Sequence, residues 1–126
     1  MLQVYLLQFD PQIMKIQAEV LQLHNETEYR LDIELKKVLN AEGYDFYDYS
    51  DEITILVDDR GFEKELNPVF EIVSGYGDVS RLAGRLLFVR NVENDFSTDI
   101  DSIKYEDIFK LSTQLQIKLV GVTKGE

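Results

Sequence analysis

The sequence predicts a single small α+β domain over residues 1–126, with a mixed, mostly antiparallel sheet and two main helices. The run Leu-Leu-Phe-Val at residues 86–89 is wholly apolar and lies between Gly84 and Asn91, which is typical of a strand buried on both faces. Shorter segments with alternating apolar and polar residues surround this run, and two longer segments have apolar residues at helical spacing. A length of 126 residues fits one domain, and a hydrophobic content of 44% is ordinary for a globular protein.

The beginning of the chain is predicted to form a hairpin. Residues 2–9 are rich in Leu, Val, Tyr and Phe, and Asp10-Pro11 then signals a turn, because proline fixes φ and aspartate favours turns. From residue 13 to residue 20 apolar and polar residues alternate, which predicts a half-buried second strand that ends at His24.

A first helix is predicted over residues 27–41. Thr27 is suited to cap it, Lys36 and Lys37 favour its carboxyl end, and Gly43 lies just beyond as a stop. The apolar residues at helical spacing are Leu31, Leu35, Val38 and Leu39. The same segment also alternates as a strand would, at Tyr29, Leu31, Ile33 and Leu35. The choice between helix and strand therefore stays open at this point.

Two further strands are predicted at residues 44–49 and 53–57, with turns at 50–52 and 58–61. Gly75 and Gly77 predict an irregular connection over residues 75–78. We expect a polar acidic loop at 93–101, a second helix over 102–115 capped by Asp101 or Ser102, a short strand at 117–122, and a loose end at 123–126.

Composition and charge narrow the function classes. With 13 Lys and Arg against 24 Asp and Glu, the formal net charge is −11, which repels nucleic acid and anionic membranes and favours basic partners. The absence of cysteine excludes disulfides and thiolate metal sites. No apolar run approaches the roughly 20 residues of a membrane helix, and no amino-terminal signal is evident. We expect a soluble cytoplasmic protein without direct binding to nucleic acid or membrane.

The later part of the chain carries a series of short motifs. In order they are Asp58-Asp59-Arg60-Gly61, Leu66-Asn67-Pro68, Gly77-Asp78-Val79, Leu82-Ala83-Gly84, Asn94-Asp95-Phe96-Ser97 and Tyr105-Glu106-Asp107-Ile108. Over the last two thirds of the chain this order resembles domain-of-unknown-function family 3846, whose members are small proteins of phages and other mobile elements. The segment before Tyr44 departs from that family in its length. The resemblance implies a phage-type accessory protein and transfers no functional residue.

One acidic stretch partly matches a calcium-binding loop. Residues 95–106 place oxygen side chains at the first, third, fifth and twelfth positions, on Asp95, Ser97, Asp99 and Glu106. The sixth position, which requires glycine for its sharp turn, is Ile100, and an apparent strand takes the place of the entering helix. We therefore predict no metal site.

A glycine pair with two nearby cations suggests an alternative ligand site. Backbone N–H groups at Gly75 and Gly77, with Arg81 and Arg85, would form an anion-binding nest for an anionic metabolite or nucleotide. The spacing matches neither the Walker loop nor the dinucleotide fingerprint. A plain structural turn is the competing interpretation.

Catalytic signals are weak. His24 is the only histidine, so with no cysteine in the chain any Ser-His arrangement would depend on that one residue. Carboxylates are abundant enough that pairs of them indicate nothing specific. We expect a non-enzymatic protein without a cofactor.

The charge distribution indicates a protein-binding surface. Residues 42–59 contain seven acids and no Lys or Arg, and aromatic residues lie among them. Such a surface would dock on a basic partner, and in a phage-type protein it would act as a DNA mimic that inhibits a host defence or nucleic-acid enzyme. The expected contact residues are Asp45, Tyr47, Asp48, Tyr49, Asp51 and Glu52. The competing interpretation is a solvated face that only keeps the protein soluble.

Overall fold

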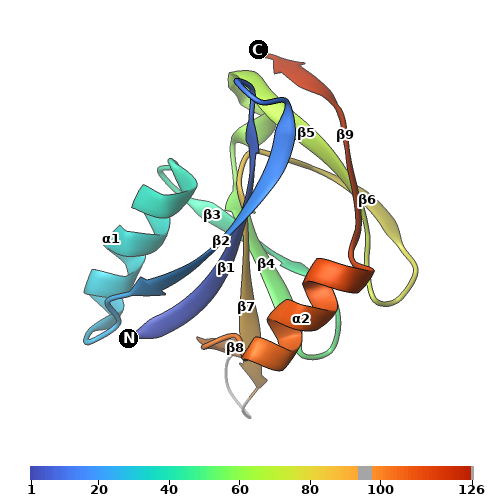
Figure 1. Ribbon diagram of the computed structural model, residues 1–126. Coiled ribbons are helices and arrows are strands. Elements are labelled where there is room, and N and C mark those ends of the chain that lie inside the picture. The colour runs from blue at the N-terminus through green and yellow to red at the C-terminus, as the bar shows by residue number, and fades with distance from the viewer. Residues whose placement is uncertain (94–97, 126) are drawn as a thin grey trace.

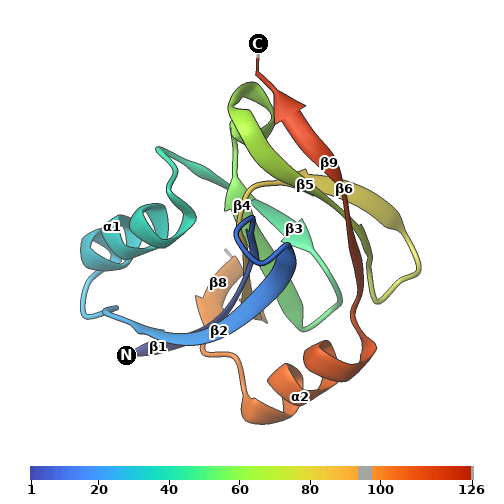
Figure 2. The same cartoon turned by 45° about the horizontal axis from the view of Figure 1, so that its top comes forward.

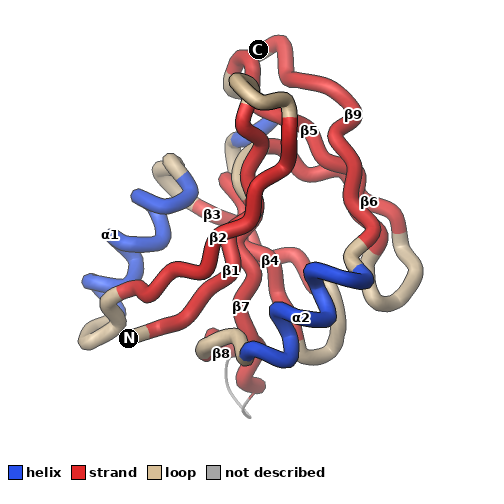
Figure 3. Tube along the Cα trace, viewed as in Figure 1, coloured by secondary structure: helices blue, strands red, loops and turns tan. Residues whose placement is uncertain are grey.

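The computed structural model describes residues 1–93 and 98–125, and these contain nine strands and two α-helices. The first elements are β1 (Leu2–Asp10), β2 (Lys15–Leu23), α1 (Glu28–Leu39), β3 (Tyr44–Asp48), β4 (Ile53–Asp58) and a 3-10 turn, η1 (Gly61–Glu63). The others are β5 (Glu65–Val73), β6 (Val79–Ala83), β7 (Leu86–Glu93), β8 (Thr98–Asp101), α2 (Tyr105–Gln114) and β9 (Gln116–Lys124). The α+β prediction is confirmed, with strands clearly dominant (Figure 3).

The strands form two sheets and not the single sheet predicted from the sequence. The large sheet has the order β2-β1-β7-β4-β3, with β8 pairing to β7, and the small sheet has the order β6-β5-β9. All pairings between described strands are antiparallel. The small sheet was missed because β5 and β6 were not recognised as strands. Pro68 lowers the strand signal of β5, and it is tolerated there because the register with β9 shifts between Glu65 and Pro68.

Strand β7 is the centre of the fold, as predicted. It pairs with β1 on one side and with β4 on the other, and residues 86–89 all have 0% exposure. Leu86 and Phe88 belong to a core between the large sheet, the small sheet and α2, which we call the inner core. Leu87 and Val89 belong to a second core under α1, which we call the α1 core. The prediction of a strand buried on both faces is confirmed.

The two helices lie on opposite faces of the large sheet (Figure 1). The view in Figure 2 shows the same arrangement, with β9 leaving α2 and running along β5 toward the C-terminus. Alternating side chains of β1 serve both faces: Val4 and Leu6 enter the α1 core, whereas Tyr5 and Leu7 enter the inner core. The period of two along a strand explains how one sheet supplies both cores.

Residues 27–41, for which the sequence left both helix and strand open, contain the helix α1. The Thr27 hydroxyl accepts the Arg30 backbone N–H at 3.0 Å, and Asn40 ends α1 in the left-handed region with φ of 52°. Leu35 and Leu39 bury the inner face of α1. The Tyr44 hydroxyl donates to Asp32 at 2.9 Å, and burial together with this bond raises the pKa of Tyr44 to about 12.

The first hairpin is confirmed, but its second strand is more exposed than predicted. β2 pairs with β1 over its whole length and forms an outer edge of the large sheet. Of the alternating apolar residues expected to be buried, only Ile16 packs against the inner core, whereas Val20 is exposed and Met14 belongs to the turn before β2. β2 is therefore a largely exposed strand at the rim of the large sheet.

Three predictions about the last third of the chain are wrong in part. The acidic loop is shorter than expected, because β7 continues to Glu93 and residues 98–101 form β8; residues 94–97 lie outside the described part of the chain. Helix α2 begins at Tyr105, since the Ser102 hydroxyl accepts the Gln3 N–H instead of capping a helix. Thr123 is buried in β9 and bonded to the Asn67 N–H, so it is no loose end.

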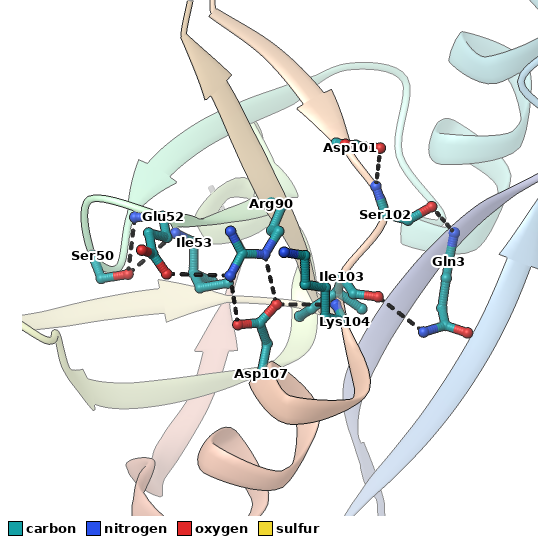
Figure 4. A network of polar contacts seen from close by, with 10 residues as sticks. All are labelled: Gln3, Ser50, Glu52, Ile53, Arg90, Asp101, Ser102, Ile103, Lys104 and Asp107. Carbon is teal, nitrogen blue, oxygen red and sulfur yellow. Dashed lines mark hydrogen bonds and ion pairs between the residues drawn. The ribbon is translucent and has the colours of Figure 1, made fainter.

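A buried ion pair holds α2 against the large sheet (Figure 4). Arg90 on β7 donates from Nε and Nη2 to both carboxylate oxygens of Asp107, at 2.8 and 3.0 Å. Nη2 also lies 3.2 Å from the exposed carboxylate of Glu52. Burial would raise the pKa of Asp107, but the bonds from Arg90 and from the Lys104 N–H outweigh it and lower this pKa below its ordinary value. The bond to Asp107 raises the pKa of Arg90.

Candidate functional site

Residues 42–59, which we call the acidic segment, contain β3 and β4. β3 forms the other edge of the large sheet. Cross-strand pairs share a face, so the pairing of β3 with β4 shows where each side chain lies. Asp45 and Tyr47 pair with Val57 and Ile55, which belong to the inner core. Phe46 pairs with Leu56 of the α1 core, so it lies on the opposite face of the strand.

The turn after β4 packs directly against β6, and Gly61 makes this contact. A Cβ atom at Gly61 would lie 2.2 Å from the carbonyl oxygen of Ala83, so any side chain there would collide with the β6 backbone. This close approach places η1, and Phe62 with it, beside the end of β6. A glycine at this position therefore allows the turn after β4 to lie against the β6 backbone.

A pocket lies where these elements come together, between β3, the β4–η1 turn and β6. Its volume is about 260 Å³. We call it the acidic pocket, and its lining residues are Asp45, Phe46, Tyr47, Val57, Asp58, Asp59, Phe62, Leu82 and Ala83. Phe46 and Phe62 are 57% and 53% exposed, respectively, which is high for phenylalanine in a folded protein. Phe62 thus presents an exposed ring beside a pocket that also contains carboxylates, whereas the ring of Phe46 lies on the other face of β3 and packs edge-on against Tyr44 with ring centroids 5.9 Å apart.

The charge of the acidic pocket is unbalanced. Asp58 is buried, pairs with the Lys64 ammonium and accepts the Arg60 N–H, so its charge is compensated. Asp45 and Asp59 are exposed, and neither side chain forms an ion pair within the described residues. No Lys or Arg is among the residues that line this pocket. Two uncompensated carboxylates beside the exposed ring of Phe62 favour a cationic group.

The remaining predicted contact residues lie elsewhere, so the structure divides the acidic segment. Asp48 pairs with Thr54 on the α1 side of β3. Tyr49 packs edge-on against Phe88 with ring centroids 6.1 Å apart, and burial raises its pKa. Asp51 accepts the Tyr76 hydroxyl at 2.6 Å. Glu52 contacts Arg90 at the other end of the strand pair.

Tyr47 has a structural role in addition to lining the pocket. Its hydroxyl donates to the Ser80 hydroxyl on β6 at 2.8 Å, and its ring packs against the inner core. Tyr47 therefore links the large sheet to the small sheet. It is not a freely available anchor for a partner.

This role predicts a modest loss of stability for Tyr47→Phe. The change keeps the ring and removes the bond to Ser80, so the free energy of unfolding should fall by about 1 kcal/mol. Urea denaturation of Tyr47→Phe, Ser80→Ala and the double variant provides the measurement, since two residues that act through one bond give non-additive losses. Strictly additive losses would show that the two hydroxyls do not interact.

The glycine-rich loop between β5 and β6 does not form the predicted anion nest. Its backbone N–H groups already have acceptors within the protein: Gly75 donates to Tyr49, Gly77 to Ser74, and Tyr76 and Asp78 to the Ser74 hydroxyl. Arg85 donates to the Val38 carbonyl oxygen at 2.8 Å, on the α1 side of the molecule. Arg81 lies 3.5 Å from the Glu71 carboxylate on the neighbouring strand. The structure supports the alternative interpretation, a structural turn, with Gly77 at φ of 88°.

His24 and the acidic residues form no metal-binding cluster in the described part of the chain. The His24 ring nitrogen lies 3.0 Å from Glu26 on the surface. Within residues 1–93 and 98–125 no group of three or more His, Cys, Asp or Glu could hold a metal ion. Of the calcium-loop positions, Asp95 and Ser97 lie outside the described residues, whereas Asp99 and Ile100 belong to β8. No helix in the described part of the chain is long and apolar enough to cross a membrane.

Of the nine residues that line the acidic pocket, only Asp45 and Tyr47 belong to the predicted contact set. Asp59 falls within residues 42–59 and is as acidic as the residues in that set, so composition alone was a signal for it. Phe62 follows Gly61 after the segment ends, and only the contact with β6 brings it to the pocket. Comparison of the chain with protein-family models, with curated proteins and with solved structures finds no match.

Proposed function

We propose that this protein is a binding module that receives a lysine or arginine side chain of a basic protein partner in the acidic pocket. The observation that carries the proposal is the combination of two uncompensated carboxylates, Asp45 and Asp59, with the exposed ring of Phe62 around one cavity of about 260 Å³. Carboxylates accept hydrogen bonds from a guanidinium or ammonium group, and aromatic faces attract the same cations.

The open edge of β3 supports a partner that lies along the strand. The Tyr49 N–H donates to Ile53 and the Asp59 N–H donates to Gly43, so odd-numbered residues of β3 direct their backbone groups toward β4. The even-numbered residues Tyr44, Phe46 and Asp48 therefore direct their N–H and C=O groups outward. An extended segment of a partner would form main-chain hydrogen bonds there while its basic side chain enters the pocket.

The net charge suggests the class of partner. At −11 the protein attracts basic surfaces over a distance and repels nucleic acid itself. Proteins that handle DNA or RNA present lysine and arginine in the grooves that hold the phosphates. We propose such a protein as the partner and inhibition by occupation of its basic groove as the effect. We propose binding and not catalysis as the role of this chain.

The proposal predicts that Asp45→Asn weakens partner binding more than Asp48→Asn. Both changes remove one negative charge from the same strand, but only Asp45 lines the acidic pocket. Loss of a carboxylate that bonds a cation in the complex should cost about tenfold in affinity, mainly as faster dissociation. Loss of a peripheral charge should mainly slow association, by a small factor that salt removes.

The measurement begins with affinity capture, using the wild-type chain and the Asp45→Asn, Asp59→Asn double variant as parallel baits. A basic protein retained only by the wild type is then purified, and its association and dissociation rates are measured against the single variants by surface plasmon resonance. Phe62→Ala should shorten the lifetime of that complex. Equal effects of Asp45→Asn and Asp48→Asn would show that the acidic segment acts only through its overall negative charge, which would contradict the pocket proposal.

A further inference from the structure

A second cavity, with the opposite charge, lies at the carboxyl end of α1. Its volume is about 560 Å³, which is in the range of small-molecule sites. We call it the basic pocket, and its lining residues are Lys36, Lys37, Asn40, Ala41, Glu42, Asp58, Arg60 and Lys64. Four of the chain's 13 Lys and Arg residues line it, against two acids, in a protein of net charge −11. Such a local excess of positive charge is the reverse of what the composition leads one to expect.

Two of the four cations have structural partners. The Lys36 ammonium lies 2.8 Å from Asp32, one turn earlier on α1. The Lys64 ammonium contacts the Asp58 carboxylate and donates to the Asn40 carbonyl oxygen at 2.8 Å. These contacts fix Lys36 and Lys64 and use their charge within the protein.

The other two cations are uncompensated. Lys37 and Arg60 are exposed, and their side chains make neither an ion pair nor a hydrogen bond with any described residue. They come from different elements, Lys37 from α1 and Arg60 from the turn between β4 and η1, and they line the same cavity. Two charges held on one cavity without a partner repel each other, so a bound anion would relieve that repulsion.

The carboxyl end of a helix ordinarily repels anions, because its last carbonyl groups carry partial negative charge. At α1 these groups already accept hydrogen bonds. Arg85 donates to the Val38 oxygen, Lys64 donates to the Asn40 oxygen, and the Ala41 N–H donates to the Lys36 oxygen. Arg85 and Lys64 bring positive charge to these carbonyl groups, which offsets the partial negative charge at the end of α1 and leaves Lys37 and Arg60 available to an anion in the cavity.

From this arrangement we infer that the basic pocket binds a small anion that carries phosphate. A phosphate group has three oxygens and up to two negative charges, so it can accept from the Lys37 ammonium and the Arg60 guanidinium at once. The cavity is larger than one phosphate group, and the remaining space can hold a second phosphate or an organic body. This site shares only Asp58 with the acidic pocket, and its lining includes neither of the cations, Arg81 and Arg85, that the sequence alone suggested.

The test is a titration of the intact protein with inorganic pyrophosphate and, separately, with ribose 5-phosphate, followed by NMR of the backbone amides. At about 0.15 M salt the distant acids are screened, whereas groups within the cavity are not. We expect shifts at Asn40, Ala41, Arg60 and Lys64 with both probes. Tighter binding of the sugar phosphate would indicate an organic ligand, and tighter binding of pyrophosphate an inorganic one.

Charge-changing variants make the test specific. Lys37→Gln and Arg60→Gln should each weaken pyrophosphate binding about tenfold, the usual effect of losing one hydrogen bond to a charged group. Glu42→Gln removes a repelling charge from the same cavity and should strengthen binding a few-fold. Arg81→Gln, which removes one cation from the small sheet, is the matched control and should change the affinity less than about twofold.

Two results would overturn the inference. One is an absence of shifts at the four pocket residues with either probe at about 10 mM, which corresponds to negligible affinity. The other is an equal weakening by Arg81→Gln and Arg60→Gln, which would show only a nonspecific response to charge. Asp45→Asn should leave pyrophosphate binding unchanged, so failure of this inference and failure of the proposed partner binding are distinguishable.

Discussion

Replacing Phe88 with alanine is expected to lower the free energy of unfolding by about 3–5 kcal/mol, the usual cost of truncating a buried phenylalanine. Phe88 has 0% exposure and lies on the central strand, between β1 and β4. Its ring contacts Tyr5 and Tyr49 edge-on, each with ring centroids 6.1 Å apart. Removing it would leave a cavity against two aromatic rings, Tyr5 from β1 and Tyr49 from the turn after β3, and the rigid surroundings would collapse only partly.

Phe109→Ala is the matched control for this prediction. It is the same substitution on α2, where the ring is 69% exposed, and alanine is the best helix former. Urea midpoints of the two variants should therefore differ widely, with Phe109→Ala close to the wild type. Equal midpoints for Phe88→Ala and the wild type would show that β7 is not the centre of the core.

The parts of the fold that local pattern controls were predictable. The apolar run of β7, the Asp10-Pro11 turn, the caps at Thr27 and the turns around β4 all follow from residues next to one another. The helix at α1 was ambiguous because its residues also alternate. The structure resolves it through long-range packing, since Leu35 and Leu39 meet the α1 core from one side of a helix.

The small sheet and the assembled site depended on contacts that sequence spacing does not encode. β5 pairs with β6, its neighbour in the chain, but also with β9, which begins more than 40 residues after β5 ends. The acidic segment was recognised, yet the period of two along β3 sends Asp45 and Asp48 to opposite faces. The acidic pocket then needed Phe62, which reaches it only because Gly61 packs on Ala83.

The second large effect is expected for Asp107→Asn, which should lower the free energy of unfolding by about 3 kcal/mol. Asp107 and Arg90 are 6% and 18% exposed at their side chains, so the variant would leave a largely buried guanidinium without its main partner. Arg90 keeps its contact with Glu52, and the amide oxygen of the variant side chain can still accept the Lys104 N–H. The loss of stability should therefore lie at the lower end of the range for broken buried ion pairs. Glu52→Gln, which alters the 67% exposed partner of Arg90, should cost less than about 1 kcal/mol.

The pH dependence of the free energy of unfolding shows whether the charge of Asp107 contributes to stability in addition to its hydrogen bonds. The pKa of Asp107 is lower in the folded protein than its ordinary value of about 3.9, so its carboxylate stabilises the fold above that pH. This contribution is lost as the pH falls from about 4 through the lowered folded pKa. Asp107→Asn has no such group, and its stability should therefore fall less steeply than that of the wild type on the acid side. Both proteins share the other carboxylates. Subtracting the free energy of unfolding of the variant from that of the wild type at each pH therefore removes the effect of those carboxylates. If that difference is constant from pH 7 to well below pH 4, Asp107 holds α2 through hydrogen bonds alone, and its charge adds nothing to the stability of the fold.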